Sequence, residues 1–131
     1  MRLNPDCIRD ILLTVESSTN GIDCPIWPMA YFQSAAEFPR LHKYSVDEVW
    51  GHVEQCRYHG YFVGDSVGAD GYFTVLDLSP KGHEFLANIR DDTNWKQTLK
   101  KCKDKIGSIS IPVLQSAASE VIVAALRSRL D

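Results

Sequence analysis

The sequence has no run of about 18 apolar residues, which argues against a membrane-spanning helix. Its first residues lack the apolar core of a secretory signal, so we expect a cytoplasmic protein. Positive charge is not in excess either, because 14 Lys and Arg stand against 17 Asp and Glu, for a net charge of −3. Proteins that coat nucleic acid are usually basic, so that class is disfavoured.

The sequence also lacks the spacings that mark metal and catalytic sites. No CxxC pair occurs among Cys7, Cys24, Cys56 and Cys102, which we therefore expect to act as small hydrophobic residues. His52, Cys56 and His59 fall at i, i+4 and i+7 and could share a metal, but spacing fixes no further ligand. We instead expect a half-buried Cys56 beside two surface imidazoles. Because no phosphate loop or nucleophile–base pair is recognisable, we predict a non-enzymatic protein with no metal and no cofactor.

The elements that are present predict a mainly helical α+β protein. The chain has 131 residues, 44% of them hydrophobic, which is enough for a real core. Apolar spacing and turn residues predict the following order: a helix from Pro5, an irregular segment over 22–44 with a short strand near Met29, a helix over 46–59, strands at 61–63 and 72–78 around a glycine-rich loop, and helices from Pro80, Asp92 and Pro112.

Capping residues support these helix boundaries. Asn4 precedes Pro5, Ser45 precedes a helix with Glu48 three residues on, and Ser79 precedes Pro80, each arrangement being typical of a helix N-terminus. Gly60 is placed to end the second helix in the left-handed conformation. Asp92 and Thr93 are predicted to cap the following helix.

This order of elements resembles a winged helix, which is a helix-turn-helix with a β-hairpin wing. The stretch Leu76-Asp77-Leu78-Ser79-Pro80-Lys81-Gly82 resembles the Leu-Thr-x-Lys-Gly pattern that often follows the wing, with Ser79 in place of Thr. The resemblance implies a winged-helix domain over residues 1–92. Residues 93–131 would then be an additional helical extension that packs on this domain or forms a dimer interface.

Three stretches also resemble an uncharacterised family, domain of unknown function 2513, which is common in phages and prophages. They are the opening Leu3-Asn4-Pro5-Asp6-Cys7-Ile8, the stretch Tyr44 to Val53, and the stretch Leu78 to Arg90. The resemblance implies a winged-helix fold and a phage-linked origin. It brings no established activity or site residues.

In a winged helix the helix over 46–59 would enter the DNA major groove, but its predicted exposed face is acidic. The residues expected there, together with two from the wing loop, are our candidates for binding a partner: Asp47, Glu48, Glu54, Gln55, Tyr58, Asp65 and Asp70. Residues 1–80 hold five basic and eleven acidic side chains, whereas residues 81–131 hold nine basic and six acidic. Since DNA binding depends on neutralising phosphates, the expected reading helix would repel DNA.

Two functions follow from this charge pattern. We favour a phage or prophage accessory protein that contacts a host or phage protein with a basic surface, and so modulates or inhibits a nucleic-acid machine. The alternative is a DNA-binding transcriptional regulator that uses Arg57, Lys96, Lys100 and Lys103. The lysine-rich helix can also be read as a solvated helix face or, less readily, as a contact with anionic membranes.

Two apolar groups remain to be placed. Trp27, Tyr31, Phe32 and Phe38 are expected to cover the first helix or to form an anchor for a partner. The last helix carries one row at Ile111, Leu114, Ala118, Val121 and Ala125 and a second at Ile122, Leu126 and Leu130. Because one small neighbour cannot cover both rows, we expect a homodimer with two-fold symmetry through this helix, the alternative being that it folds back on its own core.

Overall fold

The computed structural model describes residues 1–18, 29–30, 38–68, 72–105 and 109–130. The predicted class is confirmed, because these residues form a mainly helical α+β protein with two small antiparallel sheets. The chain divides into two compact units, Met1–His83 and Glu84–Asp131. The division falls within helix α4 (Pro80–Ile89), whereas the boundary expected from the sequence lies at residue 92.

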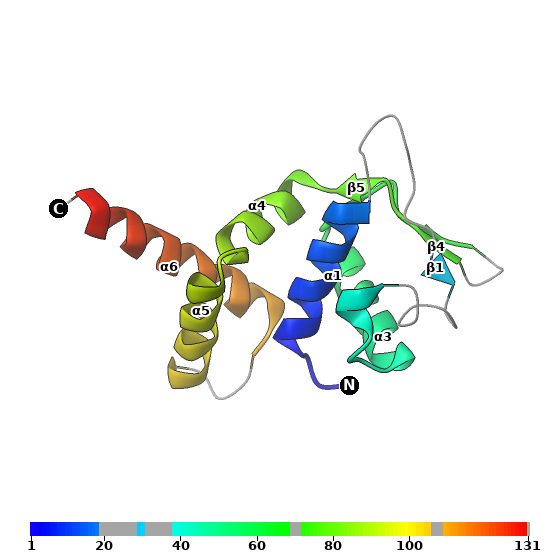
Figure 1. Ribbon diagram of the computed structural model, residues 1–131, viewed down its shortest axis with the longest axis horizontal. Helices are drawn as coiled ribbons and strands as arrows, with labels where there is room; N and C mark the ends of the chain where they lie inside the picture. The colour runs from blue at the N-terminus through cyan, green and yellow to red at the C-terminus, as the bar shows by residue number, and fades with distance from the viewer. Residues whose placement is uncertain (19–28, 31–37, 69–71, 106–108, 131) are drawn as a thin grey trace. The chain divides into compact units, whose positions relative to one another are not determined.

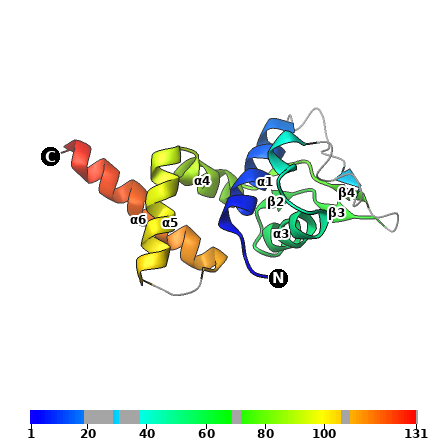
Figure 2. The same ribbon diagram turned by 60° about the horizontal axis from the view of Figure 1, so that its bottom comes forward.

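The first unit is built on α1 (Pro5–Ser18) and α3 (Val46–Tyr58), which pack against each other (Figures 1 and 2). Asn4 caps α1 as predicted, since its Oδ1 accepts from the amide of Asp6 at 3.1 Å. Ser45 caps α3 through its Oγ, which accepts from the amide of Glu48 at 3.1 Å. The short 3-10 helix η3 (Pro39–Leu41) leads into α3 and also contacts α1. The apolar faces of α1 and α3 form most of this core: Cys7, Ile8, Ile11, Leu12, Val15, Val49, Val53 and Cys56.

The strands form two short sheets instead of one simple hairpin. Strand β2 (Phe62–Val63) pairs with β5 (Asp77–Leu78), and β3 (Ser66–Val67) pairs with β4 (Tyr72–Thr74), all antiparallel. The loop predicted over 64–71 therefore holds a strand, and the strand predicted over 72–78 is broken at residues 75–76. Gly64 causes the break on the first strand, because its φ of +66° lies outside the strand region. On the second strand Val75 is fully buried, so its side chain joins the core.

The predicted short strand near Met29 is confirmed as β1 (Met29–Ala30). It pairs with β4, with Met29 opposite Phe73, and gives a three-stranded sheet in the order β1-β4-β3. The residues on either side of β1, including Trp27, Tyr31 and Phe32, lie outside the described residues. Phe38 is half-buried.

The connection from α3 through the strands to α4 is held by Ser79 and two glycines. Gly60 ends α3 with a φ of +76°, as predicted. Ser79 caps α4, because its Oγ accepts from the amide of Gly82 at 3.0 Å and donates to the carbonyl of Gly60 at 2.6 Å. Its own amide donates to the carbonyl of Tyr61 at 2.8 Å. The start of α4 is thereby fixed against the end of α3.

In the second unit α5 (Asp92–Lys105) packs against α6 (Ile111–Leu130). The predicted cap at Asp92 and Thr93 is wrong by one residue. Asp91 is the cap, because its Oδ1 accepts from the amide of Asn94 at 3.0 Å. Of the first predicted row on α6, Ile111, Leu114, Ala118 and Val121 are buried.

A buried polar pair in the first unit gives a testable dependence on alkaline pH. The Tyr44 hydroxyl donates to Asp10 Oδ2 at 2.6 Å, and burial together with this bond raises the pKa of Tyr44 above its ordinary 10.0. Burial, with Glu48 and Asp10 nearby, raises the pKa of the Cys7 thiol from 9.0 to about 12. Both groups thus stay neutral in the folded chain at pH values where they ionise in the unfolded chain. Their contribution to stability is complete below pH 9.0 and is lost progressively as the pH rises.

We expect the free energy of unfolding, measured by urea titration, to fall between about pH 9 and pH 11. Each such group contributes a slope of at most about 1.4 kcal/mol per pH unit. Tyr44→Phe removes one of them, so this variant is expected to be less stable at neutral pH and to lose stability less steeply above pH 10.0. Equal slopes for the variant and the wild type would contradict the assignment.

Candidate functional site

The face of α3 that was predicted to be exposed does face solvent. Asp47, Glu54 and Tyr58 are exposed, and Glu48 and Gln55 are half-buried. Tyr58 is the most prominent of these, with 87% of its surface accessible. Asp70 lies outside the described residues. The helix thus presents carboxylates along its length and an aromatic ring near its C-terminal end.

Arg57 is the one cation on α3, and it is tied to two acidic residues. Its Nη1 lies 2.8 Å from Glu54 Oε1, and its Nε lies 2.9 Å from Asp65 Oδ2 in the turn between β2 and β3. These two hydrogen bonds raise the pKa of Arg57. The guanidinium therefore clamps the hairpin to α3 and is already neutralised where DNA would need a free charge.

The N-terminal part of α3 holds the largest departure from the sequence prediction. His52 was expected at the surface, but it is completely buried. Its Nδ1 lies 2.6 Å from the carbonyl of Glu48, and its Nε2 accepts from the amide of Asn4 at 2.7 Å. This pattern requires a neutral ring with the proton on Nδ1. The expectation failed because the residue that covers His52 is 48 positions away in the sequence.

Asn4 links the two helices through its side chain as well. Its Nδ2 donates to Glu48 Oε1 at 3.0 Å, so this carboxylate belongs partly to the scaffold. Both nitrogens of His52 are occupied, which leaves it unable to bind a metal together with Cys56 and His59. Within the described parts of the chain, no group of three or more His, Cys, Asp or Glu residues is arranged to hold a metal ion.

At the C-terminal end of α3, Lys81 contacts His59 and Tyr61, an arrangement that the sequence pattern did not predict. Lys81, in the first turn of α4, donates to the carbonyl of His59 at 3.0 Å and lies 5.5 Å from the ring centre of Tyr61. Partial burial, and then the charge of Lys81, lower the pKa of His59. In the sequence, this contact between Lys81 and His59 is indicated only by the Lys81-Gly82 pair after the strands. The pair places a cation in the first turn of α4, close to the end of α3.

The lysines of α5 lie in the second unit. Lys96, Lys100 and Lys103 are exposed at i, i+4 and i+7, so they share one side of the helix. They form no ion pair with the part of the chain that the structure describes. Lys101 differs, because its Nζ lies 3.1 Å from Glu120 Oε2 on α6.

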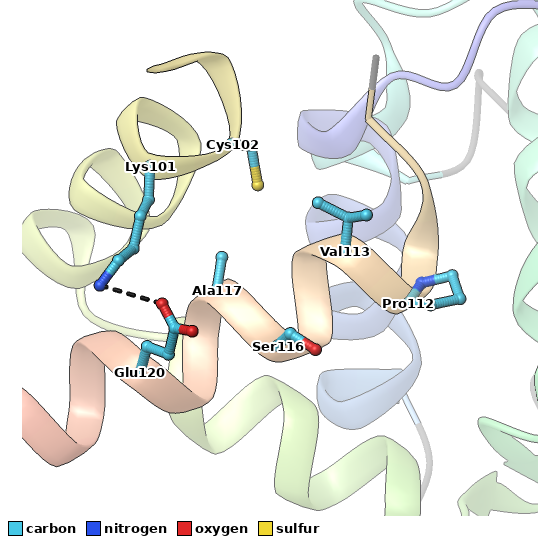
Figure 3. Close-up of a pocket in the computed structure, with 7 residues that line it drawn as sticks. All are labelled: Lys101, Cys102, Pro112, Val113, Ser116, Ala117 and Glu120. Carbon is cyan, nitrogen blue, oxygen red and sulfur yellow. Dashed lines mark ion pairs between the residues drawn. The ribbon is translucent and has the colours of Figure 1, made fainter. Parts of the chain in front are cut away.

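A hollow of about 300 Å³ lies between α5 and α6 (Figure 3). It is lined by Lys101, Cys102, Pro112, Val113, Ser116, Ala117 and Glu120, with the Lys101–Glu120 ion pair across it. Burial raises the pKa of Cys102, so its thiol is a weak nucleophile. Cys7, Cys56 and Cys102 are all free and buried, as expected of small hydrophobic residues, although Cys56 is completely buried and was predicted to be half-buried. Cys24 lies outside the described residues.

The fold and the surface together define a mainly helical α+β protein that carries an acidic helix face in one unit and a lysine-bearing helix in the other. A family described as Hypothetical protein (DUF2513) matches residues 2–108, and the chain belongs to this family. Neither the curated proteins nor the solved structures include a match. Over the described residues, the structure has no helix with both the length and the hydropathy to cross a membrane.

Proposed function

We propose that Met1–His83 forms a winged-helix domain and that the protein is a non-enzymatic accessory protein of phage or prophage origin. The order α1, β1, α3, hairpin and α4 supports the winged-helix assignment, with β1 completing a three-stranded sheet. The resemblance of the Leu78–Arg90 stretch to a family common in prophages supports the origin. The protein acts in the cytoplasm through contact with another protein and uses no cofactor.

The acidic face of α3 is the observation that carries this proposal. In a winged helix this helix would lie against DNA, yet it exposes Asp47 and Glu54, and its one cation, Arg57, is paired with Glu54 and Asp65. An acidic face would be repelled by phosphates and attracted to a basic protein surface. Tyr58 supplies an exposed aromatic ring of the kind enriched at binding hot spots.

The partner that fits this face is a host or phage protein with a basic surface. A surface that normally binds nucleic acid has the required charge, so occupying it would inhibit or modulate a nucleic-acid machine.

One observation favours a second candidate, a DNA-binding regulator. Lys96, Lys100 and Lys103 form an exposed cationic row without ion pairs to the described residues, and such a row can contact phosphates. In this case DNA would bind α5 in the second unit, and α3 would stay free of DNA.

A binding experiment on the full chain separates the two. At about 150 mM salt we expect no retention of duplex DNA in a mobility shift. We expect tagged protein to capture a basic protein from host lysate, with capture lost in an Asp47→Asn, Glu54→Gln variant. Lys96→Gln, Lys103→Gln is the control, in which the net charge changes by the same amount with the opposite sign, and it is expected to retain capture.

The regulator would give a different pattern. DNA affinity would fall steeply with salt, by a slope of up to about −2.7 in a double-logarithmic plot for three phosphate contacts. Replacing Lys96, Lys100 and Lys103 by Glu would abolish it. This result would overturn the proposed function if, in addition, the Asp47→Asn, Glu54→Gln variant captured the basic protein as well as the wild type does.

A further inference from the structure

Helix α6 changes its apolar side halfway along its length. Its first half buries Ile111, Leu114, Ala117, Ala118 and Val121, while no residue from Ile122 to Leu130 is buried. Nevertheless this second half carries large apolar side chains: Val123 is 45% exposed, Leu126 54% and Leu130 85%. Figures 1 and 2 show this end of α6 extending beyond α5.

The exposed residues form one seam, which is defined by Val123, Leu126 and Leu130. Their spacing of three and then four residues is the a–d–a spacing of a coiled coil. At about 100° per residue, Val123 lies half a turn around the helix from the buried Leu114. The seam therefore lies on the opposite side of α6 from Leu114. Helix α5 reaches only its first residue, since Val123 lines a hollow together with Lys101, and Leu126 and Leu130 stay exposed.

The charges beside the seam indicate what covers it. Glu120 and Arg127 are seven residues apart, so they lie on the same flank of the seam. Glu120 precedes Val123 along the helix, and Arg127 follows Leu126. A matching surface must offer a cation and then an anion in the reverse order. A second copy of α6 that runs antiparallel offers this order, because its Arg127 lies near Glu120 and its Glu120 near Arg127.

We propose that two copies of the chain pair through the second halves of their α6 helices, antiparallel and related by a two-fold axis. Val123 packs opposite the partner's Leu126, and Glu120 forms an ion pair with the partner's Arg127. Glu120 also keeps its pair with Lys101, which lies 3.1 Å from Oε2. This interface is separate from the acidic face of α3, so either proposal can fail while the other stands.

The first test is the mass of the full chain in solution as a function of concentration. From about 5 to 500 µM, sedimentation should show a shift from 14.7 kDa to twice that mass. Leu126→Lys should weaken association by about tenfold or more, because it places a charge in the apolar seam. Ser128→Lys adds the same charge in the same exposed half of α6 but off the seam, and it should dimerise like the wild type.

The ion pair and the direction of the helices can be tested separately. Glu120→Arg or Arg127→Glu alone should weaken the dimer, and the double variant should restore it. Under mild oxidation, a mixture of Val123→Cys and Leu126→Cys chains should form mixed disulfides faster than either variant forms disulfides with itself. Wild-type protein gives the background from its native cysteines.

Three outcomes would overturn the proposal. One is a monomer at every concentration, and another is equal association of Leu126→Lys and the wild type. The third is efficient crosslinking of Leu126→Cys with itself, which indicates parallel helices. A monomer that sediments with anionic phosphatidylserine vesicles, and loses this binding in Leu126→Lys, would assign the seam to a lipid surface instead.

Discussion

Gly82→Ala is expected to lower the free energy of unfolding by about 2–4 kcal/mol, although alanine is the better helix former. A Cβ at position 82 would overlap the carbonyl oxygen of Tyr61 and lie 3.2 Å from its carbon. Both obstacles are backbone atoms, and the amide of Ser79 donates to the same carbonyl at 2.8 Å. The start of α4 and the end of α3 would therefore have to move apart, which opposes the gain of about 1 kcal/mol in helix propensity.

Two other glycines provide matched controls for this prediction. Gly60 has a φ of +76° and open space around it, so Gly60→Ala is expected to cost about 1 kcal/mol from the backbone alone. Gly51 lies within α3, where a Cβ would meet only the flexible end of the Met1 side chain. Gly51→Ala should thus be neutral or stabilise by up to about 1 kcal/mol.

Urea unfolding followed by circular dichroism measures all three variants. The expected order of stability is Gly51→Ala, then Gly60→Ala, then Gly82→Ala. A Gly82→Ala variant as stable as the wild type would show that α4 does not approach Tyr61 this closely. It would also remove the physical reason for a glycine after Lys81 in the Ser-Pro-Lys-Gly stretch.

Local features of the fold were predictable from the sequence because their causes are local. Asn4, Ser45 and Ser79 cap helices through amides two or three residues away, and Gly60 is read from its position after an apolar helix. The broken hairpin was not predicted, because the apolar run 72–78 does not show where its pairing stops. The gap at residues 75–76 lies opposite Gly64 and Asp65 in the first strand, and the φ of +66° at Gly64 interrupts the pairing there.

The candidate site was predictable in composition but not in its interactions. Helical spacing placed Asp47, Glu54 and Tyr58 on one face, and all three are exposed. The pairing of Arg57 with Asp65 needed the position of the hairpin relative to α3, which no spacing gives. This pairing strengthens the electrostatic argument against DNA binding by α3, because the one cation of the helix already forms ion pairs within the fold.

The two observed units carry opposite net charges, but the separation is smaller than at the predicted boundary, residue 92. Met1–His83 holds six basic and eleven acidic side chains, and Glu84–Asp131 holds eight and six. Opposite net charges on the two units mean that salt will weaken contacts made by either one. The seam on α6 is apolar, so the proposed dimer should depend less on salt than binding through α3. A salt series can hence distinguish the two contacts in the same protein.

His52→Leu is expected to destabilise the protein by about 2–3 kcal/mol, although leucine suits a buried site. The change removes the acceptor for the amide of Asn4 and the donor to the carbonyl of Glu48. The carbonyl of Glu48 lies in the interior of α3, where a helix carbonyl accepts from a backbone amide. The amide of Asn4 precedes α1 and loses its acceptor. The cost is accordingly that of one unsatisfied amide and two lost hydrogen bonds.

Two comparisons make this prediction specific to the hydrogen bonds. His59→Leu changes a half-buried histidine at the C-cap of the same helix and should shift stability by no more than about 0.5 kcal/mol. Asn4→Ala keeps the backbone amide on His52 but removes the cap of α1 and the bond to Glu48, so it should cost about 1 kcal/mol. The nitrogen chemical shifts of His52 should report a proton on Nδ1 and none on Nε2 at neutral pH. A proton on Nε2, or an equal effect of the two histidine changes, would contradict the assignment of His52 as the residue that fixes the N-terminal segment to α3.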